Sequence, residues 1–198
     1  MKRILIVGSG DVALRALPWL TRRFRVFALV RQPDSAAALR AAGAIPIAGD
    51  LDDRRSLHRL AGLADAVLHF APPPSSGEGD PRTKRLLAAL GSRKSLPQGL
   101  VYISTTGVYG DCAGVHVDET RPCNAQTARG RRRVDAERRL RAFGMHRRLP
   151  LGVADDLRAG AVDRRGDLLV CARQKDRKFI TANARSMVWR SNDTVQDF

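Results

Sequence analysis

A glycine-rich turn near the start of the chain is the feature that most constrains how this sequence can fold. The apolar run Lys2–Val7 leads directly into Gly8–Ala13, which has the spacing G-x-G-x-x-A. Gly8 permits a tight turn out of a strand, Gly10 lets backbone N–H groups approach a ligand, and Ala13 allows a helix to pack closely on the strand. Because a helix N-terminus carries free N–H donors and a positive dipole end, the turn predicts a pyrophosphate site.

The residues up to about position 143 alternate between apolar runs and segments with helical spacing. Further strands are predicted at Arg25–Val30, Ile45–Ala48, Ala66–Phe70 and Leu100–Ser104, and helices at Val12–Thr21, Ser35–Ala42, Asp52–Leu60, Pro81–Leu90 and Ala125–Phe143. Pro18 predicts a kink or an early end in the first helix. Strands that are apolar on both faces and alternate with helices predict an α/β fold, a Rossmann-type doubly wound parallel sheet that binds its ligand at the carboxyl ends of the strands.

The composition is typical of a globular protein rather than a membrane protein. Of the 198 residues, 43% are hydrophobic and 28% are charged, and no apolar run reaches the roughly 20 residues that span a bilayer. The first apolar run stops at Gly8 and an acidic residue follows at Asp11, so we expect no secretion signal and a cytoplasmic protein. Cys112, Cys123 and Cys171 lack the spacing of metal ligands, so we expect reduced thiols and no metal site.

The chain is strongly basic, with 35 lysines and arginines against 20 acidic residues and a formal net charge of +15. Such a charge attracts anions, among them nucleotide phosphates and nucleic acids. Many of the arginines fall in Arg129–Arg133 and Arg138–Arg141, within the last predicted helix, and no aromatic residues are interleaved with them. We therefore interpret this helix as carrying a solvated basic face and expect no nucleic-acid partner.

The end of the second predicted strand indicates which dinucleotide the fold prefers. NAD-binding sheets of this type carry an acidic residue there, which holds the 2′-hydroxyl of the ribose. This sequence has Arg31 instead. A guanidinium at that place pairs with a 2′-phosphate, so we predict NADP as the cofactor, with NAD as the alternative. The non-binding alternative is a solvated arginine at a strand exit.

Two more loops follow strands at the same edge of the sheet. Asp50 can accept a hydrogen bond from the adenine amino group or cap the next helix, and Leu51 can pack on the adenine ring. The loop Phe70–Pro72 is expected to pass beside the nicotinamide ribose. From these patterns the predicted cofactor-binding residues are Gly8, Ser9, Gly10, Asp11, Val12, Arg31, Asp50, Leu51, Phe70, Ala71 and Pro72.

Several segments resemble the extended short-chain dehydrogenase/reductases, in particular the NAD-dependent epimerase/dehydratase family. They are the glycine turn, Gly49–Leu51, Val101–Asp111 and Asp118–Pro122. The most specific segment is Ser104–Gly110, which is similar to the S-[ST]-x-x-V-Y-G segment of sugar-nucleotide epimerases. The resemblance spans Met1 to about Phe143. It implies a nicotinamide dinucleotide cofactor and, for an active enzyme, an anionic sugar-nucleotide substrate.

The same resemblance implies a catalytic set of a serine or threonine hydroxyl with a Y-x-x-x-K pair. The hydroxyl position falls on Thr105 or Thr106, the tyrosine position on Arg129 and the lysine position on Arg133. Because arginine does not deprotonate in proteins, Arg129 cannot exchange the proton that hydride transfer requires. Arg133 can still hold a ribose or a phosphate, so it joins the predicted cofactor-binding residues. Tyr109 is the remaining candidate for the acid/base.

The pattern changes after Phe143. Residues 1–143 are predicted to be the NAD(P)-binding domain, and residues 144–198 an irregular, partly disordered segment with one strand at Asp167–Ala172. The substrate lobe that the resemblance implies is therefore reduced or missing, either through truncation or a frame change, or in a short form whose last strand completes the sheet.

The sequence as a whole predicts an NAD(P)-binding protein with impaired or absent catalysis. The alternatives are a non-catalytic dinucleotide-sensing regulatory protein and, more weakly supported, nucleic-acid binding through the basic helix.

Overall fold

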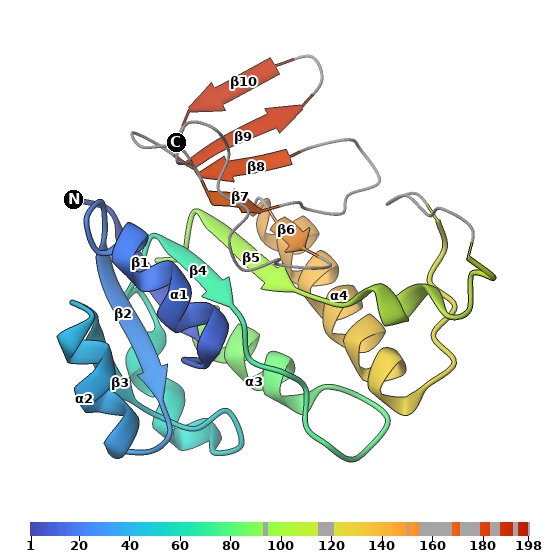
Figure 1. Cartoon of the computed structure of the whole chain (residues 1–198), viewed down its shortest axis with the longest axis horizontal. Helices are drawn as coiled ribbons and strands as arrows, with labels where there is room; N and C mark the ends of the chain where they lie inside the picture. Colours follow the sequence, from blue (N-terminus) through green and yellow to red (C-terminus); the bar gives the residue numbers. More distant parts are fainter. Residues whose placement is uncertain are drawn as a thin grey trace.

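The computed structural model describes residues 1–92, 95–114, 121–149, 151–154, 168–170, 179–182, 187–191 and 194–197. A parallel sheet of six strands in the order β3-β2-β1-β4-β5-β6 forms the centre of the fold (Figure 1). Its strands are β1 (Arg3–Val7), β2 (Arg25–Val30), β3 (Ile45–Ala48), β4 (Ala66–His69), β5 (Gly99–Ile103) and β6 (Leu151–Ala154). Every neighbouring pair in this sheet runs parallel.

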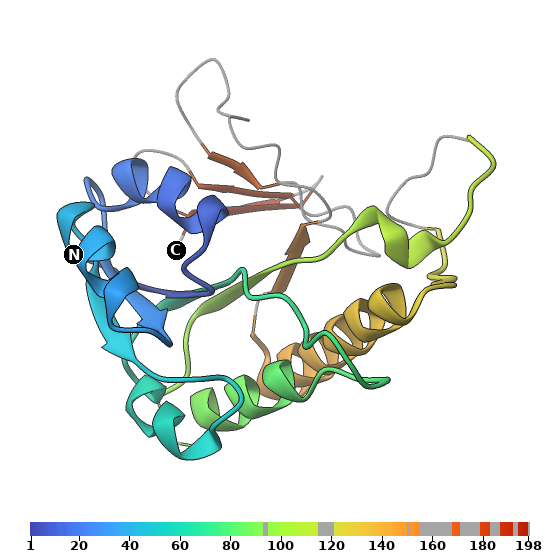
Figure 2. The ribbon, with the colours of Figure 1, turned by 60° about the horizontal axis from the view of Figure 1, so that its bottom comes forward.

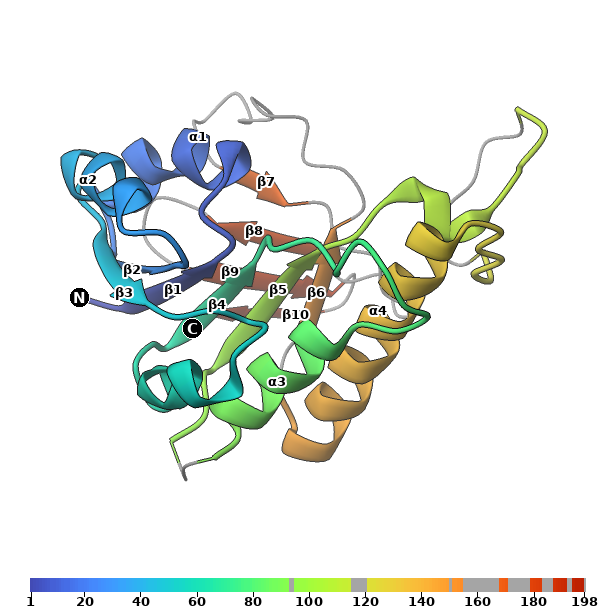
Figure 3. The ribbon, with the colours of Figure 1, turned by 90° about the horizontal axis from the view of Figure 1, so that it is seen from below.

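Helices cover both faces of the sheet. They are α1 (Asp11–Leu20), α2 (Asp34–Ala41), α3 (Pro81–Leu90), α4 (Ala128–Arg147) and two 3₁₀ helices, η1 (Arg54–Leu60) and η2 (Thr106–Tyr109). The helices α1 and α2 lie on one face and α3 and α4 on the other (Figure 3). On that second face α3 and α4 run side by side (Figure 2). This arrangement confirms the predicted Rossmann-type doubly wound fold.

The side chains of β1 show why its sequence is apolar without interruption. Ile4 and Ile6 point into the core beneath α1 and α2, whereas Leu5 and Val7 point into the core beneath η1, α3 and α4. All four are at most 1% exposed. Successive strand residues alternate between faces, so a strand covered on both sides needs apolar residues at every position.

The helix boundaries follow from local capping. The Asp80 side chain accepts a hydrogen bond from the Thr83 amide and starts α3, with Pro81 in the first turn. Thr127 caps α4 by accepting from the Gly130 amide. Pro18 does not end α1, which continues to Leu20.

The structure differs from the sequence prediction after Phe143. Helix α4 continues to Arg147, and β6, which was not predicted, pairs in parallel with β5 as a sixth strand. The strand predicted at Asp167–Ala172 is observed as β7 (Leu168–Val170). It pairs antiparallel with β8, so the alternative in which this strand completes the parallel sheet is wrong. The four-residue β6 follows a basic segment and is too short to show a period of its own.

The strand β7 belongs to a separate antiparallel sheet in the order β10-β9-β8-β7. The other members of this sheet are β8 (Phe179–Ala182), β9 (Met187–Ser191) and β10 (Thr194–Asp197). All the other residues from 155 onward lie outside the described ranges, so the division of the chain at residue 143 and the partial disorder of the segment remain predictions. Among the described residues, no helix combines the length and the apolar character needed to cross a membrane.

Candidate functional site

The strand order reverses between β1 and β4, and the loops after these two strands meet there. Val7 and His69 are paired at the ends of the strands, and the Phe70 and Ala71 amides both donate to the Val7 carbonyl, at 2.7 and 2.9 Å. Gly8 has φ +100°, and a Cβ on it would lie 2.3 Å from the Ala71 nitrogen. Only glycine fits this close approach of two backbones. In doubly wound sheets a reversal of this kind is where ligands bind.

Gly10 is a glycine for a different reason. It precedes α1 with φ −82°, which any residue can adopt, and no side chain caps the helix. A Cβ on Gly10 would meet nothing within 4 Å. The packing of the protein therefore does not require glycine here, but a side chain would fill the space in front of the free N–H groups of the helix start. The residues present thus fit a phosphate group that approaches the backbone closely.

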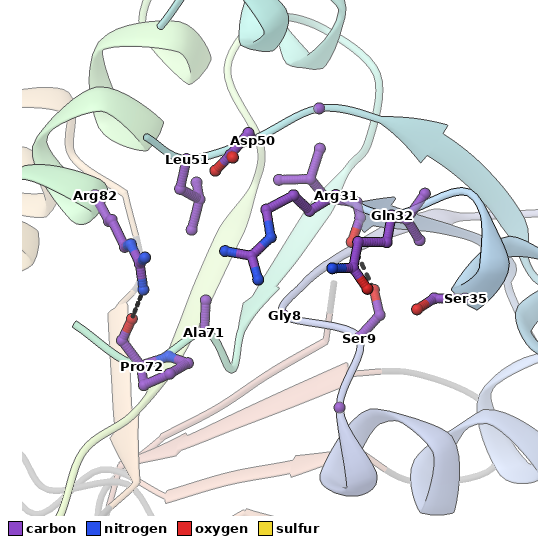
Figure 4. A pocket seen from close by; sticks show the side chains of 14 residues that line it. Gly8, Ser9, Arg31, Gln32, Ser35, Asp50, Leu51, Ala71, Pro72 and Arg82 are labelled. Carbon is purple, nitrogen blue, oxygen red and sulfur yellow. Dashed lines mark hydrogen bonds between the residues drawn. The ribbon is translucent and has the colours of Figure 1, made fainter. Parts of the chain in front are cut away.

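A pocket of about 330 Å³ opens at this place, at the carboxyl ends of β1 to β4 (Figure 4). Its volume lies within the range of roughly 300–1,000 Å³ that is usual for small-molecule sites. The lining residues are Gly8, Ser9, Gly10, Leu29, Val30, Arg31, Gln32, Ser35, Gly49, Asp50, Leu51, Ala71, Pro72 and Arg82. Eight of the predicted cofactor-binding residues are among them: Gly8, Ser9, Gly10, Arg31, Asp50, Leu51, Ala71 and Pro72.

Two arginines give the pocket its positive charge. Arg31 reaches from the end of β2 across the pocket (Figure 4), and it forms no hydrogen bond or ion pair with any residue that the structure describes. Arg82, from α3, is bonded instead to the Asp52 carboxylate, and this hydrogen bond is the main cause that holds the pKa of Asp52 below its ordinary value. A cation directed into a pocket without a directly bonded carboxylate favours binding of an anion.

Asp50 and Leu51 line the pocket and their contacts with an adenine remain a prediction, but the capping alternative for Asp50 is wrong. The 3₁₀ helix η1 is capped by Asp53, which accepts from the Arg55 amide at 2.9 Å. Asp50 instead accepts from the Asp52 amide at 2.9 Å, in a local turn that holds its carboxylate at the pocket. Leu51 is 8% exposed. It packs in the core beneath η1, α3 and α4 and also lines the pocket.

Three predicted residues of this region do not line the pocket. Asp11 is exposed and forms an ion pair with Arg15 one helical turn away, at 2.9 Å. Val12 is half-buried in the first turn of α1, and Phe70 packs against the core beneath α1. For Asp11 and Val12 only the backbone N–H groups at the helix start remain as contacts with an anion, and this role stays a prediction.

The sequence analysis missed two pocket residues that come from helices. Ser35 lies in the first turn of α2, and Arg82 is the second residue of α3. No local pattern distinguishes them, because only the packing of the helices against the strand ends brings them to the pocket. The other lining residues without a predicted role are Leu29, Val30, Gln32 and Gly49.

The residues predicted to take part in catalysis lie at η2, and none of them lines the pocket. Thr105 caps η2 by accepting from the Gly107 amide at 3.4 Å, and Thr106 is exposed. Tyr109 is 3% exposed. Because a proton-exchanging group has to reach the substrate, this burial counts against Tyr109 as the acid/base.

The two arginines that replace the Y-x-x-x-K pair differ in environment. Arg129 is exposed near the start of α4, whereas Arg133 is 7% exposed. The Arg133 guanidinium donates from Nη1 to the Tyr102 hydroxyl at 3.1 Å and to the Ile103 carbonyl at 2.5 Å. These bonds hold the end of β5 to α4, while burial raises the pKa of Tyr102 above its ordinary value. The contact of Arg133 with a cofactor remains a prediction.

The basic helix is less solvated than its sequence suggests. Arg132 and Arg133 are both 7% exposed, so the interpretation of Arg129–Arg133 as a solvated face is wrong for these two positions. Arg132 donates to the Gly77 carbonyl at 2.9 Å, which ties the loop before α3 to α4. Arg139 forms an ion pair with Asp135 on its own helix, with 2.7 Å between Nε and Oδ2. Much of the basic charge thus serves internal contacts.

His69, which ends β4, gives the fold a pH dependence that can be measured. Its Nε2 lies 2.9 Å from the Thr83 hydroxyl. Burial, with the nearby Arg133 charge as second cause, lowers the pKa of His69 to about 3. The unfolded chain binds a proton at this histidine below about pH 6.5, whereas the folded chain does not, so stability is lost as the pH falls through this range.

We expect the wild type to lose about 2 kcal/mol more of its unfolding free energy between pH 7 and pH 5 than His69→Gln. Urea unfolding at the two pH values measures this difference. An equal loss in the two proteins would show that His69 is protonated in the folded state. Glutamine keeps a polar group near Thr83 but does not titrate. Because both proteins contain the same carboxylates, the difference between their losses reports the histidine alone.

Among the described residues, no three histidine, cysteine, aspartate or glutamate side chains come together in a way that could hold a metal ion. The pocket at the strand ends is the candidate functional site of the described residues.

The chain matches one family model and is similar to a curated ketoreductase and to several solved structures. A family model described as NAD(P)H-binding matches residues 8–144. A curated relative, the 4-hydroxy-2-methyl-3-oxo-4-farnesyl-3,4-dihydroquinoline-1-oxide ketoreductase of Stigmatella aurantiaca, is 32% identical over 132 residues, which are 62% of this chain and 39% of the relative. The chain thus spans about two fifths of the length of that curated relative.

Solved structures with the same fold include a functionally unknown conserved protein from Silicibacter pomeroyi DSS, which is 32% identical with a TM-score of 0.63, over 78% of this chain and 53% of that one. The UDP-glucose 4-epimerase of Bifidobacterium longum, solved with NAD+ and UDP, is 19% identical with a TM-score of 0.65, over 77% and 52%. The UDP-Glc/GlcNAc 4-epimerase of Campylobacter jejuni is 20% identical with a TM-score of 0.67, over 78% and 53%.

The chain therefore spans about half the length of these solved structures. The two epimerases are similar in fold alone, whereas the family model covers most of the parallel-sheet region, from the glycine turn to the last turn of α4. The pocket described above lies within the matched residues. The chain belongs to the NAD(P)H-binding family, and it shares its Rossmann-type fold with the two epimerases.

Proposed function

We propose that the chain binds NADP(H) in the pocket at the ends of β1 to β4, with impaired or absent hydride-transfer catalysis. One observation carries the choice of NADP. Arg31 is directed into the pocket and forms no hydrogen bond or close ion pair with the described residues, although its charge acts on the nearby Asp52 carboxylate, which Arg82 already binds. A 2′-phosphate would supply the missing anion, and guanidinium groups pair well with phosphates through parallel N–H bonds.

The rest of the pocket supports the same orientation of the dinucleotide. The pyrophosphate would lie over Gly8 and Gly10 at the start of α1, where the space in front of the N–H groups is open. Asp50 and Leu51 would hold the adenine, with the carboxylate accepting from the amino group. The adenosine half of the cofactor therefore accounts for most of the lining, and in any turnover the oxidised cofactor would accept a hydride and NADPH would donate one.

Impaired catalysis is supported by the arrangement around β5 and α4. Arg129 cannot replace the tyrosine, since an arginine retains its proton. Arg133 is bonded to Tyr102 and Ile103 inside the protein rather than exposed to a substrate. If turnover is retained, the substrate class we propose is an anionic sugar nucleotide. If it is lost, the chain is a dinucleotide-sensing regulatory protein, and the two cases differ in whether sugar nucleotides change the nicotinamide absorbance.

The choice between NADP and NAD is tested by Arg31→Ala. We expect this change to weaken binding of NADPH by about 10- to 100-fold, because a hydrogen-bonded charge pair contributes roughly 1.5–3 kcal/mol, and to leave binding of NADH almost unchanged. Titration calorimetry with each cofactor measures the two affinities. Arg40→Ala, which removes an exposed arginine from α2 outside the pocket, is the matched control. Equal affinities of Arg31→Ala and wild type for NADPH would overturn the assignment.

A further inference from the structure

The pocket lacks the kind of side chain on which a flat base usually stacks. None of its fourteen lining residues is aromatic. An adenine ring in this pocket can pack one face on Leu51, and for its other face the guanidinium plane of an arginine offers a flat partner in place of an aromatic ring. The lining offers two guanidinium groups, those of Arg31 and Arg82. Arg31 is committed to the 2′-phosphate in the proposed function, which leaves Arg82.

The contacts of Arg82 fix the orientation of its guanidinium plane. Its Nε lies 3.0 and 3.1 Å from the two carboxylate oxygens of Asp52, and its Nη2 lies 2.5 Å from one of them. This forked contact defines the plane of the group, since a guanidinium and a carboxylate bonded in this way are held nearly coplanar. The remaining Nη1 faces the Pro72 carbonyl at 3.4 Å, as Figure 4 shows.

These contacts also place Arg82 between two walls of the pocket. Asp52 belongs to the loop after β3, next to Asp50 and Leu51, whereas Pro72 belongs to the loop after β4. Arg85 supports the same loop from outside, because its Nη1 donates to the Leu51 carbonyl at 3.2 Å and lies 3.5 Å from Asp52. Arg85 does not line the pocket. The two arginines of α3 thus share one carboxylate, but only Arg82 can touch a ligand.

We propose that Arg82, oriented by Asp52, is the adenine-binding residue of this pocket and contributes equally to the binding of NADP and of NAD. The inference rests on the proposed function, because it assumes that the pocket holds a dinucleotide. It assigns Arg82 a role different from that of Arg31. Arg31 distinguishes the two cofactors by the 2′-phosphate, whereas Arg82 recognises the base, which the two cofactors share.

The test is titration calorimetry of the full chain with NADPH, NADH and nicotinamide mononucleotide, which has no adenine. Arg82→Met keeps the length of the side chain and removes its planar cation. We expect this variant to weaken the binding of NADPH and NADH by the same factor, about 10-fold, since base stacking contributes roughly 1–3 kcal/mol. Binding of nicotinamide mononucleotide should not change. Lys84→Met, which removes an exposed cation of the same helix outside the pocket, is the matched control and should leave all three affinities as in the wild type.

Asp52→Asn provides a second, independent variant. It leaves Arg82 in place but removes the charge that orients it, so it should weaken both dinucleotides by less than Arg82→Met does. Deamino-NAD, which carries a carbonyl in place of the adenine amino group, separates the base stack from the Asp50 hydrogen bond. Arg82→Met should weaken deamino-NAD and NAD by the same factor.

Several results would overturn the inference. If Arg82→Met lost affinity for NADPH alone, Arg82 would be a second residue that binds the 2′-phosphate. If its affinities for NADPH and NADH were those of the wild type, Arg82 would not contact the dinucleotide. A lower melting temperature of the unliganded Arg82→Met protein, with weaker binding of nicotinamide mononucleotide as well, would mean that Arg82 only maintains the fold. If the wild type itself binds neither NADPH nor NADH, the proposed function fails instead.

Discussion

Gly10→Glu is expected to abolish dinucleotide binding while leaving the fold intact. The glutamate side chain would extend into the open space in front of the first N–H groups of α1, where the pyrophosphate is proposed to lie. Like charges about 4 Å apart repel by roughly 4 kcal/mol at an effective dielectric constant of about 20, so affinity should fall by at least about 100-fold. The unliganded variant should melt close to the wild type, since φ at Gly10 is −82° and no neighbour crowds the position.

The matched control for this prediction is Leu14→Glu. Leu14 lies in the second turn of the same helix, is 41% exposed and does not line the pocket. The substitution Leu14→Glu therefore adds the same charge to α1 but outside the proposed phosphate site. Titration calorimetry with NADPH should give near wild-type affinity for Leu14→Glu and no measurable binding for Gly10→Glu. Tight binding by Gly10→Glu would contradict the placement of the pyrophosphate.

Gly8→Ala is expected to have the largest effect on stability. The backbone at Gly8 has φ +100°, and the added Cβ would lie 2.3 Å from the Ala71 nitrogen and 2.6 Å from its Cα. The left-handed backbone costs about 1–2 kcal/mol for a residue with a side chain, and the clash with a fixed backbone adds about as much again or more. A loss of about 3–5 kcal/mol lowers the melting temperature of a chain of this length by roughly 10 °C.

Gly10→Ala separates this effect from a general effect of alanine in the turn. It adds the same methyl group two residues later, into open space and at an ordinary φ, so it should cost at most about 1 kcal/mol. Urea unfolding of both variants without ligand measures the difference. A Gly8→Ala protein as stable as Gly10→Ala would mean that the loops after β1 and β4 are not held together as the structure has them.

Much of the parallel sheet could be predicted from the sequence, because β1, β2, β4 and β5 are largely buried on both faces. In such strands every position is apolar, as in Ile4–Val7, and the pattern is visible without knowing the neighbours. The strand β6 could not be predicted in this way, because it has only four residues and follows a basic segment. Its assignment depends on pairing with β5, which is a contact distant in sequence.

The residues of the candidate site also fall into two groups, those that a sequence pattern reveals and those that only the packing of the fold brings to the pocket. The glycine turn, Arg31 and Asp50 each follow a strand directly, so the rule that ligands bind at strand ends was enough to predict them. Arg82 lies on a helix and reaches the pocket only because α3 packs beside the loop after β3. The burial of Arg133 was likewise invisible in sequence, where it is one arginine in a basic run.

The most direct test of the account is a thermal-shift titration of the wild-type chain with NADPH and, separately, with NADH. A ligand that binds only the folded state stabilises it by about 2.7 kcal/mol at a concentration 100 times its Kd. We predict that the melting temperature rises with the NADPH concentration by several degrees, and that NADH needs a higher concentration for the same rise. A melting temperature that neither cofactor changes at any concentration would contradict dinucleotide binding in this pocket.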